Sequence, residues 1–141
     1  MLYRIARGGV VGYQDGQTPL VYLVTTIDDV RRNGLRWVFS NGNCGAPTTE
    51  HFNDLRLLDV KVDWDLQEAV MWAPTAEDPN RMTRRAAEFL VHQQLPWEVI
   101  RWVAARTAAA AAAVQAMLSE AGSSQRVLVR PRWYYNGRKY R

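Results

Sequence analysis

The chain has 141 residues, of which 48% are hydrophobic and six are tryptophan, so it can bury the core of one globular domain. A single cysteine, Cys44, and two histidines exclude a disulfide framework and a thiolate zinc site; we therefore expect no metal and a reducing, cytoplasmic setting. No apolar run approaches the length that crosses a membrane, and the net charge of +4 is only modestly basic.

The first forty residues predict two strands with a short helix between them. Residues 20–24 are β-branched and aromatic enough to form a central strand. Thr25 or Thr26 then caps a helix that has acidic residues in its first turn and stops at Asn33-Gly34. Residues 37–39 predict the second strand.

A glycine- and asparagine-rich loop follows at residues 40–47, where these residue types permit unusual backbone angles. Residues 49–58 then place Phe52, Leu55 and Leu58 on one side of an expected helix.

The second half of the chain again mixes strands and helices. Residues 89–91 predict a short buried strand, and residues 97–105 predict a turn that continues as a strand. A helix capped by Thr107 runs through the alanine tract to about Glu120, and residues 126–130 form the last strand. Because strands and helices do not alternate regularly, the expected class is α+β.

Glu88 is the strongest candidate for chemistry. It directly precedes the strand at 89–91, which would hold its carboxylate rigidly beside a cleft, and it follows a proline-punctuated loop at 72–83. A rigid carboxylate behind a loop that carries an aromatic and arginines is a catalytic arrangement. The alternative is a surface glutamate paired with Arg84 or Arg85.

The C-terminal sixteen residues combine arginines with aromatic side chains, which together can grip phosphates and stack on unpaired bases. A basic solvated tail is the alternative, and both hypotheses stay open. The residues concerned are Arg126, Arg130, Arg132, Trp133, Tyr134, Tyr135, Arg138, Lys139, Tyr140 and Arg141.

Familiar enzyme signatures are absent from the sequence: it has no dinucleotide or Walker glycine loop, no Gly-x-Ser-x-Gly and no zinc spacing. A magnesium nuclease is a weaker alternative, because acids near a lysine are common. Its candidate residues would be Asp59, Lys61, Asp63, Asp65 and Glu88.

Several segments, in the same order along nearly the whole chain, resemble the DarT family. They are residues 1–5, 12–17, 19–23, 78–92, 96–98 and 133–135. Members of that family are toxins of a toxin–antitoxin pair that transfer ADP-ribose from NAD to a base, commonly thymidine, in single-stranded DNA. The resemblance implies a mono-ADP-ribosyltransferase-like α+β fold with central sheets and flanking helices. It also implies NAD as a substrate and a macrodomain antitoxin as a partner.

Carried over by position, Glu88 matches the family's catalytic glutamate, and residues 71–87 match a mobile loop that presents the substrate. Met1 and Asn43 are the candidate NAD-binding residues, although some members place a histidine near the position of Asn43. The candidate DNA-contacting residues are Trp72, Arg81, Arg84 and Arg85.

The resemblance also implies that residues 1–141 form the C-terminal two thirds of a single domain that is N-terminally incomplete. In the family, a region before the Met-Leu-Tyr motif supplies a histidine-bearing strand that cradles NAD and an arginine that accepts a proton. Two explanations of this incompleteness stay open: a start codon assigned too late, and a genuine remnant or split protein. The expected function is therefore NAD-dependent transfer of ADP-ribose to DNA, with little activity in this chain alone. The alternative is a noncatalytic module that binds single-stranded DNA.

Overall fold

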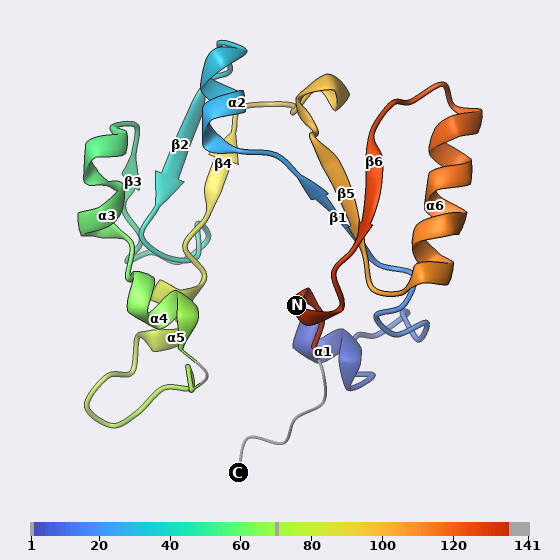
Figure 1. Ribbon diagram of the computed structural model, residues 1–141. Helices are drawn as coiled ribbons and strands as arrows, with labels where there is room; N and C mark the ends of the chain where they lie inside the picture. The colour runs from blue at the N-terminus through green and yellow to red at the C-terminus, as the bar shows by residue number, and fades with distance from the viewer. Residues whose placement is uncertain (1, 70, 136–141) are drawn as a thin grey trace. The chain divides into compact units, whose positions relative to one another are not determined.

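The computed structural model describes residues 2–69 and 71–135 (Figure 1). The chain divides into two compact units, and the division falls within α2 (Ile27–Arg32). Unit 1 comprises Met1–Asp29 and Pro96–Arg141, and unit 2 comprises Val30–Leu95. The mixture of short sheets and helices confirms the α+β class expected from the sequence.

Unit 1 is built on a three-stranded sheet with the order β1-β5-β6. Strand β5 (Trp102–Ala105) pairs antiparallel with β1 (Val21–Val24) and parallel with β6 (Arg126–Val129). The prediction of a central strand at 20–24 is therefore wrong in its placement, because β1 lies at the edge. The reason is burial: Val103, Ala104 and Ala105 of β5 are almost completely buried, whereas Leu23 of β1 is 54% exposed.

Helix α6 (Ala108–Glu120) connects β5 to β6 and packs alongside β6, as Figure 1 shows. It begins as predicted, because the Thr107 hydroxyl accepts a hydrogen bond from the N–H of Ala110 at 3.2 Å. It ends before Gly122, whose positive φ of 69° suits glycine. The remaining helices of unit 1 are α1 (Leu2–Ala6) and the single 3-10 turns Trp97–Val99 and Pro131–Trp133.

The aromatic residues near the C-terminus are structural members of unit 1. Tyr134 is only 3% exposed, and its hydroxyl lies 2.7 Å from the carbonyl oxygen of Leu20 and 3.1 Å from that of Ala104. Its ring, like that of Trp133, makes an edge contact with Tyr22. Burial therefore removes Tyr134 from the residues that could stack on a base. Of the other residues of that expected patch, Arg138, Lys139, Tyr140 and Arg141 lie outside the described residues.

Unit 2 holds a second antiparallel sheet with the order β3-β2-β4. Strand β2 (Trp37–Ser40) is central, and β3 (His51–Phe52) and β4 (Phe89–Val91) flank it. Aromatic rings pack across both ladders: Trp37 stacks on Phe89, and Phe39 packs on Phe52, each at 5.2 Å between centroids. Because β4 is an edge strand, its side chains are half-buried rather than fully buried as predicted.

The helix expected over residues 49–58 is wrong. The side chain of Asn41 exchanges hydrogen bonds with Glu50, both at 3.0 Å, which aligns the chain with β2 and gives β3 instead. Asp54 then accepts a hydrogen bond from the N–H of Arg56, so helical structure begins only at the 3-10 turn Leu55–Leu57 and continues as α3 (Leu58–Lys61).

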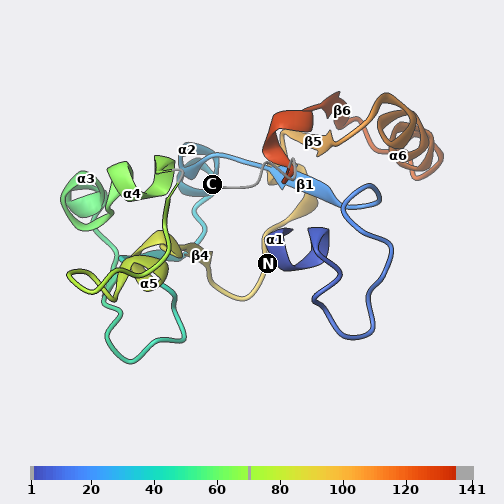
Figure 2. The ribbon, with the colours of Figure 1, turned by 90° about the horizontal axis from the view of Figure 1, so that it is seen from below.

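Two further short helices lie side by side in both views of the ribbon (Figures 1 and 2), namely α4 (Trp64–Glu68) and α5 (Arg81–Arg85). The expected loop over residues 71–87 is therefore wrong in its last part, where α5 forms. No helix of the described residues is both long enough and apolar enough to span a bilayer.

Candidate functional site

Glu88 lies where β4 meets the end of β2. The N–H of Ser40 donates to the carbonyl oxygen of Glu88 at 2.8 Å, and the N–H of Glu88 donates to the Ser40 hydroxyl at 3.0 Å. Ser40 is fully buried. The backbone of Glu88 is therefore held at the strand edge, as its place in the sequence predicts, while its side chain stays exposed.

The carboxylate of Glu88 is oriented by Cys44. The backbone N–H of Cys44 donates to Oε2 of Glu88 at 2.9 Å. The Cys44 side chain first, and its backbone N–H second, lower the pKa of Glu88 below its ordinary value. The same contact raises the pKa of the Cys44 thiol. Glu88 is thus a fixed, ionised carboxylate at neutral pH, suited to stabilising positive charge.

The turn that contains Cys44 packs tightly against α5. A Cβ on Gly42 would lie 2.9 Å from the carbonyl oxygen of Thr83, so only glycine fits there. The N–H of Asn43 donates to that same oxygen at 2.9 Å, and Oδ1 of Asn43 accepts from the N–H of Gly45. Asn43 is therefore held directly before Cys44, the residue whose N–H binds the Glu88 carboxylate.

A polar cavity of about 170 Å³ lies between this turn and α5. Its lining consists of one glycine, one arginine and several asparagine and threonine residues, namely Asn41, Gly42, Thr48, Thr49, Asn80, Thr83 and Arg84. A second cavity of about 270 Å³ lies on β2 and β4 and is lined by Arg36, Trp37, Val38, Leu90, Val91 and His92.

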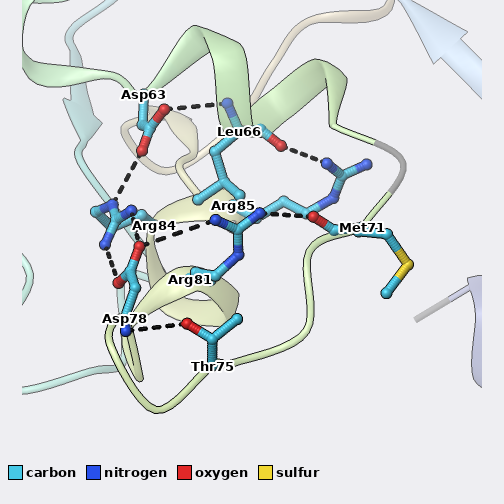
Figure 3. Close-up of polar contacts among 8 residues, drawn as sticks. All are labelled: Asp63, Leu66, Met71, Thr75, Asp78, Arg81, Arg84 and Arg85. Carbon is cyan, nitrogen blue, oxygen red and sulfur yellow. Dashed lines mark hydrogen bonds and ion pairs between the residues drawn. The ribbon is translucent and has the colours of Figure 1, made fainter.

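The arginines expected to contact DNA are gathered on α5, but their guanidinium groups bind partners within unit 2 (Figure 3). Arg84 forms a bidentate ion pair with Asp78, in which both hydrogen bonds are 2.8 Å long, and donates a further hydrogen bond to Asp63 at 3.1 Å. These bonds lower the pKa of Asp78 and raise that of Arg84. Arg84 therefore joins α4 and α5 to the segment between them.

The other two arginines of α5 bind main-chain carbonyls (Figure 3). Arg81 donates to the carbonyl oxygen of Met71 at 2.6 Å. Arg85 donates to the carbonyl oxygens of Leu66 and Ala69 at the end of α4, and its guanidinium lies 5.9 Å from the centre of the Trp72 ring. The structure thus brings the four predicted DNA-contacting residues together, while three of them stabilise the segment before α5.

Several residues of the site were not predicted from the sequence. Nothing in the sequence indicated that Ser40 binds Glu88 or that Asp63 and Asp78 bind Arg84; Ser40 and Asp63 are also distant in the chain from these partners. Cys44 was noted as a lone cysteine and as part of the loop at 40–47, and its contact with Glu88 was not predicted. Met1, predicted to bind NAD, lies outside the described residues.

The magnesium-nuclease alternative gains nothing from the geometry. Asp63 caps α4 by accepting from the N–H of Leu66 at 3.0 Å, and it also pairs with Arg84. Within residues 2–69 and 71–135, no three His, Cys, Asp or Glu side chains gather where they could hold a metal ion.

A model of the DarT family, described as ssDNA thymidine ADP-ribosyltransferase, matches residues 1–135. A DNA ADP-ribosyl transferase from Mycobacterium tuberculosis is 34% identical over 135 residues, which are 96% of this chain and 58% of that protein. The chain thus spans less than two thirds of the length of this curated relative.

Two solved structures of DarT from Thermus sp. 2.9 share the fold at 30% sequence identity. The complex with NAD+ has a TM-score of 0.85 and is matched over 95% of this chain and 66% of that chain. The complex with ADP-ribosylated ssDNA also has a TM-score of 0.85, over 95% of this chain and 63% of that chain. These matches confirm the resemblance and the fold expected from the sequence.

Proposed function

Because this chain belongs to the DarT family, we propose that it transfers ADP-ribose from NAD to a base of single-stranded DNA, with Glu88 as the catalytic carboxylate. One observation carries the proposal: Glu88 is exposed, ionised and fixed in direction by the N–H of Cys44. Relatives of known structure bind NAD+ and ADP-ribosylated ssDNA, which supports the choice of both substrates.

In the proposed reaction, the bond between nicotinamide and the ribose breaks, and its electron pair leaves with nicotinamide. The sugar gains positive charge, and a nearby carboxylate stabilises that charge as it develops. A ring nitrogen of the acceptor base forms the new bond to the same carbon and releases a proton. One fixed carboxylate contributes about a few kcal/mol to such a step, roughly two to three powers of ten in rate.

On the NAD side, we propose that Asn43 contacts the substrate through its amide nitrogen, because its amide oxygen is already bound to the N–H of Gly45. The same role for Met1 rests on sequence resemblance alone. We also propose that residues 1–141 belong to a single transferase domain.

On the DNA side, we propose that Trp72 contacts a base and that the three arginines of α5 set the shape of the segment that carries it. The ring of Trp72 lies beside Arg85, and an aromatic ring with a cation is a common platform for an unpaired base. Single-stranded DNA presents such a base without the cost of flipping, which is about a few kcal/mol. The proposal has three further parts. The acceptor is thymidine, the partner is a macrodomain antitoxin, and the site of action is the cytoplasm.

The test is the intact mass of a thymidine-containing single-stranded oligonucleotide after incubation with NAD and the 141-residue chain. We expect slow addition of one ADP-ribose by the wild type, in line with the little activity expected of this chain alone, and a rate lower again by about 10²- to 10³-fold for Glu88→Gln. Glu98→Gln, at an exposed glutamate of unit 1, is the matched control and should keep the wild-type rate. Equal rates for Glu88→Gln and the wild type would refute the role of Glu88. Salt-sensitive binding of the oligonucleotide without any modification would instead favour the noncatalytic binding module.

A further inference from the structure

Glu88 makes contacts with a single five-residue segment, Ser40 to Cys44, at both its backbone and its carboxylate. The Ser40 hydroxyl accepts the N–H of Glu88 at 3.0 Å, and the Cys44 N–H donates to Oε2 of Glu88 at 2.9 Å. These two contacts come from opposite ends of the segment. The conformation of the segment therefore fixes the direction of the Glu88 carboxylate relative to the Glu88 backbone.

The Ser40 hydroxyl also determines that conformation. It donates to the carbonyl oxygen of Gly42 at 2.7 Å, which folds the segment back on itself two residues before Cys44. A serine hydroxyl has one proton to donate and lone pairs to accept, and Ser40 uses both functions while fully buried. One side chain therefore links the backbone of Glu88 to the turn that binds the Glu88 carboxylate.

The far side of the turn is fixed independently of Ser40. The carbonyl oxygen of Thr83 accepts the N–H of Asn43 at 2.9 Å, and the Thr49 hydroxyl donates to the carbonyl oxygen of Asn43 at 2.7 Å. Gly42 leaves no space for a Cβ against Thr83. Thr49 and Thr83 thus hold Asn43, and Ser40 holds the neighbouring Gly42, so the direction of the Cys44 N–H depends on both sets of contacts.

We propose that Ser40 is a positioning residue of the proposed transferase, which acts through the turn to Cys44 to aim the Glu88 carboxylate. The inference rests on the proposed function for its catalytic consequence. The control of the Glu88 carboxylate by Ser40 does not depend on that function, because the pKa of Glu88 can be measured without any reaction.

The charged side chains on the elements around Glu88 bind other partners, so the turn at Ser40 to Cys44 is the main influence on the direction and pKa of the Glu88 carboxylate. The Cys44 thiol is the titratable group beside it. On α5, Arg84 pairs with Asp63 and Asp78, and Arg85 binds the end of α4. On the strand side, Glu50 binds the Asn41 side chain and Lys61.

The experiment compares the 141-residue wild type with Ser40→Ala, with Ser40→Thr as the conservative variant that restores a hydroxyl. The first readout is the pKa of Glu88 by carboxyl ¹³C NMR on glutamate-labelled protein, assigned with Glu88→Gln. The second is the split between kcat and KM for oligonucleotide modification. Ser119→Ala, at an exposed serine of α6 whose hydroxyl bonds only within its helix, is the matched control.

We expect Ser40→Ala to raise the pKa of Glu88 toward its ordinary value and to lower kcat by roughly 10- to 100-fold with little change in KM. Ser40→Thr should recover most of both quantities, and Ser119→Ala should change neither. A folded Ser40→Ala with the wild-type Glu88 pKa and kcat would overturn the proposal.

Two controls separate the possible failures. If Ser40→Ala does not fold, Ser40→Cys keeps a similar side-chain size with a weaker donor, and an unchanged Glu88 pKa in that folded variant would overturn the proposal. If the wild type modifies no DNA but Ser40→Ala still shifts the Glu88 pKa, the positioning by Ser40 stands and the proposed function fails. Cys44→Ala keeps the backbone N–H but removes the thiol, which is the first cause of the lowered Glu88 pKa. Adding Ser40→Ala to Cys44→Ala should therefore raise the Glu88 pKa further, and an unchanged pKa in that double variant would overturn the role of Ser40.

Discussion

The two units achieve order by different means. Unit 1 has a continuous apolar core in which seven residues are almost fully buried, namely Val99, Ile100, Val103, Ala104, Ala105, Ala111 and Tyr134. Unit 2 has fewer such residues, namely Val30, Phe39, Val62 and Leu66, and its site is held by hydrogen bonds from buried or half-buried polar side chains. Apolar packing is non-directional, whereas hydrogen bonds fix angles as well as positions. The unit that carries the Glu88 carboxylate is therefore the one that relies on directional contacts.

The two units also differ in the length of their helices. Unit 1 contains the thirteen-residue helix α6, whereas α3, α4 and α5 of unit 2 have four or five residues each. Helices this short are not stable by themselves. In unit 2 they depend on side chains such as Arg85, which binds the carbonyls at the end of α4.

The largest stability effect is expected in the core of unit 1. Tyr134→Ala should lower the free energy of unfolding by about 3–5 kcal/mol, because it removes a buried ring. Tyr134→Phe, which removes only the hydroxyl near two carbonyls, should cost about 1–3 kcal/mol. Denaturant unfolding followed by tryptophan fluorescence measures both values. An equal cost for Trp133→Ala, at a residue 44% exposed, would contradict the assignment of Tyr134 to the core.

A smaller effect is expected in unit 2 from Arg85→Met. The variant keeps the apolar stem but leaves the carbonyls of Leu66 and Ala69 without their donor, at a cost of about 1–3 kcal/mol. It also frees the ring of Trp72, so acrylamide should quench the fluorescence of that residue more strongly. Arg106→Met, at a basic residue of unit 1, is the control. Unchanged quenching in Arg85→Met would show that Arg85 does not hold Trp72.

A pH effect follows from Asp78. Its pKa is lowered in the folded state by the hydrogen bonds from Arg84, so its stabilising contribution is present above its ordinary pKa of about 4. That contribution is lost as the pH falls through the lower, folded-state pKa. Limited proteolysis between residues 71 and 80 should therefore accelerate below about pH 4. Arg84→Met should already be cleaved rapidly at neutral pH, and a cleavage rate in that variant equal to that of the wild type would exclude Arg84 as the cause.

The smallest effect concerns Cys44. Because its exposed thiol has a raised pKa beside Glu88, alkylation by iodoacetamide at pH 8 should be slower than that of an ordinary exposed thiol. Glu88→Gln removes the neighbouring negative charge and should increase the rate several-fold. Identical alkylation rates in the two proteins would contradict the contact between these side chains.

The sequence was informative where the physical cause is local. The Thr107 cap, the end of α6 at Glu120 and the strand that starts after Glu88 depend on neighbours within a few residues, and each was predicted. The failures depend on distant partners. Asn41 turns residues 49–58 away from a helix, and the position of β1 depends on its pairing with β5.

The candidate site shows the same division. The place of Glu88 at a strand edge follows from the chain around it, and the family resemblance follows from motifs in order. The partners of the α5 arginines do not, because Asp63 lies 21 residues before Arg84 and no local pattern marks Asp78 as the other partner. An arginine-rich segment therefore suggested DNA contacts where the structure uses the same side chains for its own stability.

The central claim is that unit 2 is organised around a Glu88 carboxylate held by the N–H of Cys44. The most direct test is the hydrogen exchange rate of the Cys44 amide, measured by NMR in the wild type and in Glu88→Ala. We predict a protected amide in the wild type and exchange at the rate of an exposed loop amide in Glu88→Ala. Equal, unprotected exchange in both proteins would show that the carboxylate is not held there.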